Sequence, residues 1–353
     1  MTGNQEPAIT KKDFSLTFCQ VISALAVAIL HTNGCFWDFS ATEHYWFTAN
    51  IIECIFYFAV PVFFMITGIT LADYKERYST KTFFKKRIEK TLIPYIVWSI
   101  LAVIFLLATG KLLPSDITPA WIITSVIWTS NVIAFYWFFG ALFVFYLLMP
   151  VIASIEKEKK LKVFKWFIII IFICDVTIFF ILRLIGKYPE VIDTSGIGLG
   201  NLIYIFIGYY VYKKPPTRAA KIVIYILAVF GLLTHMIGTY MLSIKLGRID
   251  EMLKGYANFP AIFHGLGVFI LLRDIAAAAE KTAWLKKFIE MLGKYTFEVF
   301  LLHWFIINFA ELIFAFDEKN LAYRLLFPFV IYAVTVAVTW CLRKIPVIRK
   351  TVP

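Results

Sequence analysis

The stretch that decides the fold is residues 56–95, FYFAVPVFFMITGITLADYKERYSTKTFFKKRIEKTLIPY. It opens with an apolar run, continues through a dense basic segment, and enters a second apolar run at Pro94 and Tyr95. Basic segments beside apolar runs indicate which side of a membrane faces the cytoplasm. The same segment offers the densest set of anion-binding side chains in the chain. Orientation and ligand charge can therefore both be argued from this stretch.

The composition points to a membrane protein. Of the 353 residues, 61% are hydrophobic and only 16% are charged, whereas soluble domains carry about 25% charged residues. A soluble protein this apolar would expose large hydrophobic patches. A β-barrel would show short alternating segments, but these apolar runs are continuous. We predict an all-α, polytopic transmembrane bundle that forms a single membrane domain over residues 1–353, with no appended soluble domain.

The apolar runs predict about ten spans of roughly 20 residues each. They cover residues 14–33, 49–70, 91–109, 132–154, 164–184, 199–212, 221–242, 257–272, 295–315 and 324–342. Two further segments are unlike the spans. The Trp-rich segment 117–130 is too short to cross and predicts an interfacial helix on the outer side. The segment 273–294 is amphipathic and predicts a helix along the inner surface.

The charge distribution predicts the orientation. With the N-terminus inside, the inner segments hold 27 of the 35 Lys and Arg residues. Such an asymmetry favours both termini in the cytoplasm and a multi-pass protein of the cell (cytoplasmic) membrane. The net charge of +12 then matches cytoplasmic loops that face anionic lipid, not nucleic acid. The five cysteines show no metal-binding or disulfide spacing, and we expect no metal.

Polar side chains inside spans are costly and mark candidate functional residues. Gln20 and His31 lie eleven residues apart, on one face of the first span and roughly 16 Å along its axis. A histidine at this outer end is either catalytic or simply hydrogen-bonded at the interface. His303 has apolar neighbours on both sides, and Glu53 lies in the second span. The zinc-protease, P-loop and hydrolase-elbow motifs are not present in the sequence.

The basic residues Lys85, Lys86, Arg87 and Lys90 open the third span. One interpretation is ordinary positive charge on the cytoplasmic side. The other is a binding site for phosphate groups, since Arg87 and Lys90 lie three residues apart on neighbouring faces of one helix. The sequence alone leaves both interpretations open.

Four stretches resemble the acyltransferase-3 family, integral membrane proteins that O-acetylate surface polysaccharides and related acceptors. They are FCQVISALAVAILH; AVPVFFMITG followed by FFKKRIEKTLIPY; FYWFFGALFVFYLLMPVI; and GKYTFEVFLLHWFII. Their order and spacing carry the resemblance over nearly the whole chain. It implies that His31 is the catalytic histidine, Arg87 the first arginine of an R-x-x-R motif, and His303 the late histidine.

The chain departs from the family pattern at three positions. Gln20 stands where relatives carry an arginine, Lys90 replaces the second arginine of R-x-x-R, and Phe135 replaces a histidine. Gln20 offers neither a charge nor a guanidinium fork. Lys90 keeps its charge but loses bidentate geometry.

The resemblance further implies an acyl-CoA donor, acetyl-CoA first, on the cytoplasmic side. We expect Arg87, Lys90, Lys86 and Gln20 to contact the donor. The acceptor is a hydroxyl of an external carbohydrate, and we expect it to contact His303, Tyr136 and Trp137. His31 then acts as general base or acyl carrier, and Glu53 orients it. Trp121, Trp128 and Trp137 form either a sugar-stacking surface or an interfacial belt.

An alternative function is transport of a polysaccharide or small solute, or ligand sensing, on the same scaffold without catalysis. The replacements at Gln20 and Phe135 favour this alternative. A homo-oligomer is compatible with the sequence, which does not decide the oligomeric state.

Overall fold

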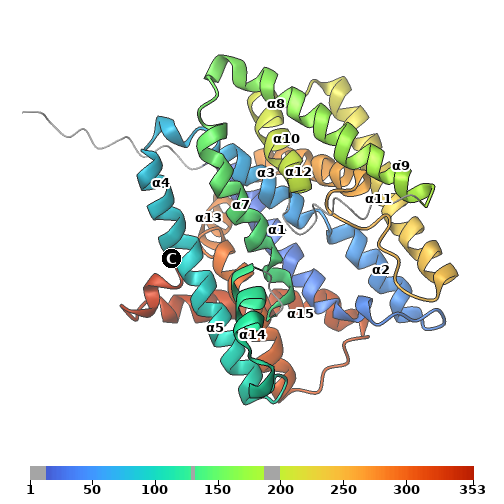
Figure 1. Ribbon diagram of the computed structural model, residues 1–353, viewed down its shortest axis with the longest axis vertical. Helices are drawn as coiled ribbons and strands as arrows, with labels where there is room; N and C mark the ends of the chain where they lie inside the picture. The colour runs from blue at the N-terminus through green and yellow to red at the C-terminus, as the bar shows by residue number, and fades with distance from the viewer. Residues whose placement is uncertain (1–12, 129–131, 187–198) are drawn as a thin grey trace, which may run out of the picture.

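The computed structural model describes residues 13–128, 132–186 and 199–353, and these form a bundle of helices (Figure 1). The α-helices are α1 (Phe14–Thr32), α2 (His44–Phe56), α3 (Ala59–Leu71), α4 (Thr80–Arg87), α5 (Ile93–Ala108), α6 (Pro119–Ile122), α7 (Trp137–Ile152), α8 (Lys157–Ile171), α9 (Ile178–Leu184), α10 (Leu202–Lys213), α11 (Arg218–Leu246), α12 (Phe259–Ala279), α13 (Ala283–Leu292), α14 (Thr296–Ile313) and α15 (Leu321–Leu342). Short π-helical turns at Ile88–Leu92 and Phe172–Thr177 join α4 to α5 and α8 to α9.

The predicted bundle of membrane-spanning helices is confirmed. Within the described residues, nine helical segments are long and apolar enough to cross a membrane, and α10 is a shorter apolar helix. The pairs α2–α3, α4–α5 and α8–α9 each form one such segment with an internal break. The predicted short span at 257–272 is longer in the structure, since α12 continues to Ala279.

The two predicted surface segments, 117–130 and 273–294, are divided among helices differently in the structure than we expected. Residues 273–279, which end in four alanines, extend α12, because alanine is the best helix former. A separate amphipathic helix, α13, then covers Ala283–Leu292. In the outer segment 117–130, α6 begins at Pro119 with the Thr118 side chain as its cap and passes into a π-helical turn that ends at Trp128. Residues 129–130 and the Trp128 side chain lie outside what the structure describes.

Helix α1 lies at the centre of the bundle, in contact with α2, α3, α12, α13, α14 and α15 (Figure 1). Beside it, α3 and α10 pack unusually closely. A Cβ atom on Gly68 would lie 2.3 Å from the Ile205 carbonyl oxygen, and one on Gly208 would lie 2.5 Å from Met65 Cα. Only glycine permits this approach of the two backbones. The close packing fixes α3, which carries part of the site described below.

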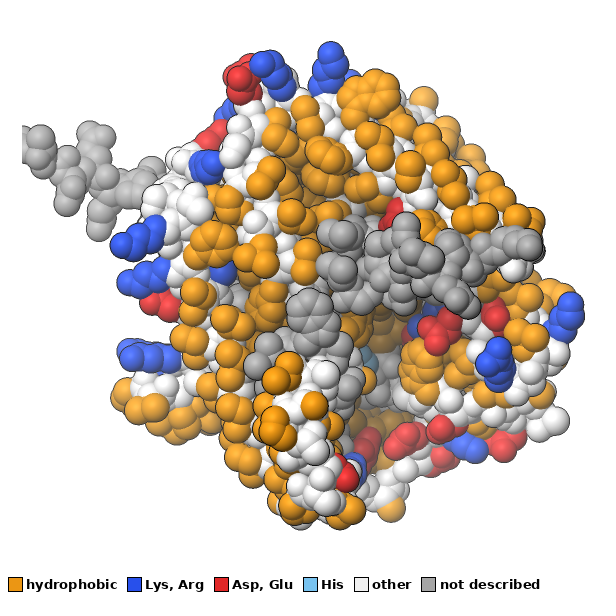
Figure 2. Space-filling model, viewed as in Figure 1, with side chains coloured by type: hydrophobic (Ala, Val, Ile, Leu, Met, Phe, Trp, Pro, Cys, Tyr) orange, Lys and Arg blue, Asp and Glu red, His pale blue; other side chains and the backbone are white. Residues whose placement is uncertain are grey.

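The two ends of the bundle differ in charge. At the end where α1 begins, here called the basic end, Asp13 caps α1 by accepting a 2.8 Å hydrogen bond from the Ser15 amide. The α3 terminus, α4 and the start of α8 lie at this end. Figure 2 shows Lys and Arg side chains over α4 and the start of α8, whereas hydrophobic side chains cover much of the viewed face between them. The opposite end, where α1 finishes beside His31, is called the histidine end.

Candidate active site

Two histidines from distant parts of the chain meet near the histidine end. Nδ1 of His31, in the last turn of α1, lies 2.6 Å from Nε2 of His303 in α14. The ring planes are nearly parallel at 14°, with centroids 4.7 Å apart. His303 is fully buried, while His31 is partly exposed. The structure therefore brings together the two histidines that the sequence singled out.

The hydrogen bonds of His303 fix where the ring protons lie. Nδ1 of His303 is 2.8 Å from the Val299 carbonyl oxygen, which can only accept, so this nitrogen carries the proton. With both rings neutral, Nε2 of His303 is then an acceptor, and Nδ1 of His31 donates to it. Nε2 of His31 is left with a free lone pair. This is the arrangement that a general base or a nucleophile requires.

Phe135 holds the histidine pair from one side. Its ring is stacked on His31 at a centroid distance of 4.1 Å and lies 4.4 Å from the ring of His303. An apolar ring thus occupies the position at which the resemblance described above led us to expect a histidine. Phe135 cannot exchange protons, and it limits the rotation of both imidazoles by packing against them.

The end of α1 is anchored by Arg324 of α15, whose side chain is buried. Its Nη1 donates to Asn33 Oδ1 at 3.2 Å, and its Nη2 donates to Thr48 Oγ1 at 2.8 Å. The Thr32 hydroxyl in turn donates to the Arg324 carbonyl oxygen at 3.3 Å. These bonds tie α1, α2 and α15 together one and two residues beyond His31. They restrict the position of its imidazole.

A cavity of about 340 Å³ lies between α1, α3, the α4–α5 segment, α7 and α14, and its lining includes neither histidine. It is called the donor cavity here because three residues predicted to contact the donor line it. Gln20, Arg87 and Lys90 line it, as do Thr67, Thr70, Thr91, Thr296 and the aromatic residues Phe63, Phe138, Tyr146, Phe297 and Phe300. Phe300 also lies beside His303, with ring centroids 6.2 Å apart, and beside Phe135, with ring centroids 5.9 Å apart. The cavity is thus polar and basic at one end and aromatic where it approaches the histidines.

Arg87 is the strongest anion-binding candidate in the donor cavity. Its guanidinium carbon lies 5.4 Å from the Tyr146 ring centroid and 5.7 Å from that of Phe83. Its Nε atom is buried and has no hydrogen-bond partner among the residues that the structure describes. A buried donor without a partner is costly in free energy unless a ligand satisfies it. Lys90, in the π-helical turn, adds a second positive charge.

Lys86, which we expected beside Arg87 and Lys90, is directed elsewhere. Its Nζ lies 4.2 Å from the Tyr78 ring centroid, a cation–π contact, and it does not line the donor cavity. Of the four residues predicted to contact the donor, the structure gathers three around one cavity.

Glu53, which we expected to orient His31, has another partner. Its carboxylate accepts a hydrogen bond from Lys254 Nζ at 2.8 Å, and both side chains are buried. Burial acts to lower the pKa of Lys254, but the Glu53 carboxylate outweighs it and holds that pKa above its ordinary value. Lys254 therefore keeps its charge, and its ion pair with Glu53 fastens the loop between α11 and α12 to α2. The partner of His31 is His303 instead.

The two aromatic residues predicted to contact an acceptor have different surroundings. Tyr136 is buried, and its hydroxyl donates to the Leu301 carbonyl oxygen at 2.7 Å, which fixes α7 to α14. Trp137 is 37% exposed, and its ring lies 5.1 Å from that of Tyr256. Tyr256 stacks in turn on Tyr57 at 4.1 Å with parallel planes. Trp137 is thus the exposed edge of an aromatic stack, two residues from Phe135.

The described residues contain no group of three or more His, Cys, Asp or Glu side chains arranged to hold a metal ion.

A family model described as an acyltransferase domain matches residues 13–344. The chain belongs to the acyltransferase-3 family. It is therefore a multi-pass membrane acyltransferase. Comparison with curated proteins gave no match, and neither did comparison with solved structures.

Sequence reasoning about this acyltransferase missed several residues of the site. It treated Phe135 only as a departure from the family pattern, although the ring packs on both histidines. It gave no weight to Lys254 or Tyr256, because both lie in the connection between two spans. The available signal was a lysine followed by Gly255 and Tyr256 in the connection of 14 residues between the predicted spans 221–242 and 257–272, since a short connection holds its side chains close to the bundle.

Proposed function

We propose that this acyltransferase transfers an acetyl group from acetyl-CoA to a hydroxyl of an acceptor outside the cytoplasm, the sugar of a surface polysaccharide being the acceptor class. The donor binds in the donor cavity, and the acceptor approaches His31 from the histidine end, across the cytoplasmic membrane. The observation that carries this proposal is the His31–His303 pair, which leaves Nε2 of His31 free beside a basic cavity.

The donor cavity suits the chemistry of acyl-CoA. Arg87 and Lys90 match its phosphate charges, and the buried Nε of Arg87 gains the partner it lacks. The apolar rings of Phe63, Phe138 and Phe300 suit the slender arm that carries the thioester. From Gln20 to His31 the helix rises roughly 16 Å, so the arm must reach deep into the bundle. Movement of the Phe300 ring would open the last part of this route.

The histidine pair supplies the proton transfers. Nε2 of His31 takes the proton of the acceptor hydroxyl as its oxygen attacks the thioester carbonyl. The imidazolium that forms is stabilised by its hydrogen bond to His303. When the carbon–sulfur bond breaks, His31 returns the proton to the leaving thiolate. In the other route Nε2 of His31 attacks the thioester carbonyl, and CoA leaves as the thiolate. The acceptor oxygen then attacks the acetyl group on His31 and the bond to Nε2 breaks. The freed Nε2 takes the hydroxyl proton and returns it to the CoA thiolate.

The aromatic stack at the histidine end supports a carbohydrate acceptor. Trp137, Tyr256 and Tyr57 form a continuous series of rings, and Trp137 presents its edge to the surface near Phe135. Exposed aromatic rings offer a flat apolar face to the C–H groups of a sugar ring while its hydroxyls stay free.

The test is acetyl transfer by the purified protein in lipid nanodiscs. Acetyl-CoA labelled in the acetyl group is supplied with a panel of oligosaccharides, and both released thiol and labelled product are measured. We expect His31→Ala to lower the rate by about 10²- to 10⁴-fold, the range for a general base. The exposed His44 provides the matched control, and His44→Ala should retain the wild-type rate.

Label recovered on the protein and lost in His31→Ala supports the acyl-carrier route, whereas label found only on the acceptor supports direct transfer. A His31→Ala rate within about twofold of wild type would contradict the proposal, since removing a catalytic base has a far larger effect. Passage of the oligosaccharide across the membrane without consumption of the donor would indicate transport instead.

A further inference from the structure

A second cavity adjoins the donor cavity at the basic end. It measures about 440 Å³ and shares Gln20 and Thr70 with the donor cavity. Its other lining residues come from α1 and its N-cap, the end of α3, the short turn that follows α3, and α10. They are Asp13, Leu16, Thr17, Ile69, Asp73, Glu76, Arg77, Tyr212 and Lys213. Most of these side chains are polar or charged. A ligand that extends from the donor cavity past Gln20 would enter this second cavity.

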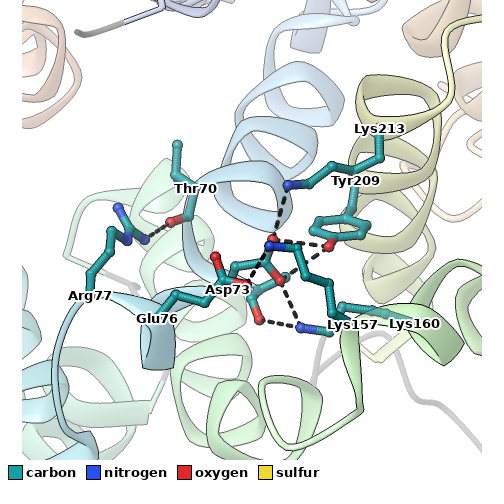
Figure 3. Close-up of polar contacts among 9 residues, drawn as sticks. Thr70, Asp73, Glu76, Arg77, Lys157, Lys160, Tyr209 and Lys213 are labelled. Carbon is teal, nitrogen blue, oxygen red and sulfur yellow. Dashed lines mark hydrogen bonds and ion pairs between the residues drawn. The ribbon is translucent and has the colours of Figure 1, made fainter. Parts of the chain in front are cut away.

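The carboxylates of the second cavity are already occupied. Asp73 Oδ1 is paired with Lys160 Nζ at 2.7 Å, and Tyr209 Oη donates to Asp73 Oδ2 at 2.9 Å (Figure 3). Glu76 is paired with Lys157 at 2.9 Å. Lys160 is almost fully buried, with 4% of its side chain exposed, and it also donates to the Ala72 carbonyl oxygen. Lys160 therefore offsets the charge of Asp73 in a largely buried ion pair.

The Asp13 carboxylate also has hydrogen-bond partners. Its carboxylate accepts hydrogen bonds from the Ser15 hydroxyl at 2.7 Å and from the Tyr212 hydroxyl at 2.8 Å.

Two cations that line the second cavity, Arg77 and Lys213, are not needed to neutralise these carboxylates. Lys213 lies 3.2 Å from Asp73 Oδ2, but Lys160 already neutralises this carboxylate, and 36% of the Lys213 side chain is exposed. Arg77 folds back to donate to the Thr70 carbonyl oxygen (Figure 3) and makes no ion pair with a carboxylate of the described residues. Both cations can turn to an anion without leaving a buried carboxylate unpaired. A doubly charged phosphate monoester is the ligand group that fits two such donors.

We infer that the second cavity binds the nucleotide end of the donor, with Arg77 and Lys213 on the 3′-phosphate that distinguishes CoA from its 3′-dephospho form. This inference rests on the proposed function. The order of the chemical groups along acetyl-CoA agrees with the order of the lining residues along the two cavities. The thioester lies toward Phe300, the diphosphate beside Arg87 and Lys90, and the nucleotide beyond Gln20. The uncharged Gln20 side chain lines the junction of the two cavities.

The test compares two donors that differ only in this phosphate. Binding of acetyl-CoA and of 3′-dephospho-acetyl-CoA to the full chain in nanodiscs is measured by calorimetry. We expect the wild type to prefer acetyl-CoA by about 100-fold, since two charge-assisted hydrogen bonds are each worth about tenfold. Arg77→Ala and Lys213→Ala should each weaken acetyl-CoA binding about tenfold, and the double variant should bind both donors equally.

Binding of the dephospho donor is the internal control, because an unchanged affinity in both variants shows that the protein is folded. The matched surface control is Lys159→Ala, since Lys159 lies at the basic end but pairs with Glu156 and lines neither cavity. Equal wild-type affinity for the two donors, or a preference that persists in the double variant, would overturn the subsite while leaving the proposed function intact. Failure of the wild type to bind either donor would overturn both.

A lipid headgroup offers the same phosphate chemistry, and the lipid composition distinguishes it. The measurements are repeated in nanodiscs of phosphatidylcholine alone and with phosphatidylglycerol added. If the 3′-phosphate occupies the second cavity, the donor preference should be the same in both lipids. Loss of the preference only when phosphatidylglycerol is present would assign the cavity to lipid and overturn the inference.

Discussion

At the residue scale, the catalytic proposal depends on the direction of two hydrogen bonds. The Val299 carbonyl oxygen sets the proton position on His303, and His303 sets the one on His31. His303 is thus a positioning residue, and Nε2 of His31 is the atom expected to react. A backbone carbonyl here takes the orienting role that a carboxylate has in many histidine-dependent enzymes.

Replacing His303 tests this chain of hydrogen bonds. His303→Ala removes the acceptor for His31 Nδ1–H, and we expect acetyl transfer to fall by about 10- to 100-fold. His303→Gln keeps an acceptor oxygen and should recover part of the loss. Because His303 does not line the donor cavity, KM for acetyl-CoA should stay unchanged in both variants. Equal rates for the Ala and Gln variants, or a change confined to KM, would contradict the positioning role.

The sequence indicated candidate residues but not the partners that the structure gives them. Helical periodicity placed Gln20 and His31 on one face of α1, and both face the site as expected. The contact between His31 and His303 joins residues 272 positions apart, and no local pattern indicates which two helices become neighbours. Glu53 was assigned to His31 because both lie near the outer ends of their predicted spans, whereas its partner in the structure is Lys254, which lies outside those spans.

At the element scale, the segment α4–α5 places part of a basic run on the donor cavity. Arg87 ends α4, and the π-helical turn Ile88–Leu92 carries Lys90 before α5 begins. Such turns are rare and occur frequently at functional sites. The structure places Arg87 and Lys90 on the donor cavity but directs Lys86 to the Tyr78 ring. The helix was predictable from sequence, whereas the π-helical turn has no known sequence signal in this run.

The adjacent residues Arg87 and Lys86 form a matched pair for testing this surface. Arg87→Ala removes a charge and the buried Nε from the donor cavity, so KM for acetyl-CoA should rise about tenfold or more. The KM of Arg87→Lys should lie between those of the wild type and Arg87→Ala, since lysine keeps the positive charge but loses the forked guanidinium geometry. Lys86→Ala removes an equal charge outside the cavity and should change KM by less than about twofold. Equal effects of the Ala variants at both positions would indicate a general electrostatic effect.

At the scale of the whole molecule, the spans were predictable because each apolar run carries its own signal of length and hydropathy. The central position of α1 was not predictable, since it depends on packing among segments far apart in sequence. The central position of α1 allows one helix to reach both parts of the candidate site. One helix lines the donor cavity through Gln20 near the basic end and carries His31 at the other end. A single helix, α1, thereby links the basic end of the bundle to its histidine end.

The most direct test of the account is acetyl transfer between two compartments. Protein is reconstituted into liposomes, and molecules with the basic end outward are selected by a cleavable tag at the C-terminus. Labelled acetyl-CoA is then added outside, with the oligosaccharide acceptor sealed inside. We predict labelled acceptor in the lumen, release of CoA outside, and loss of both in His31→Ala. Transfer that occurs only when donor and acceptor share one compartment, or that survives in His31→Ala, would contradict the account.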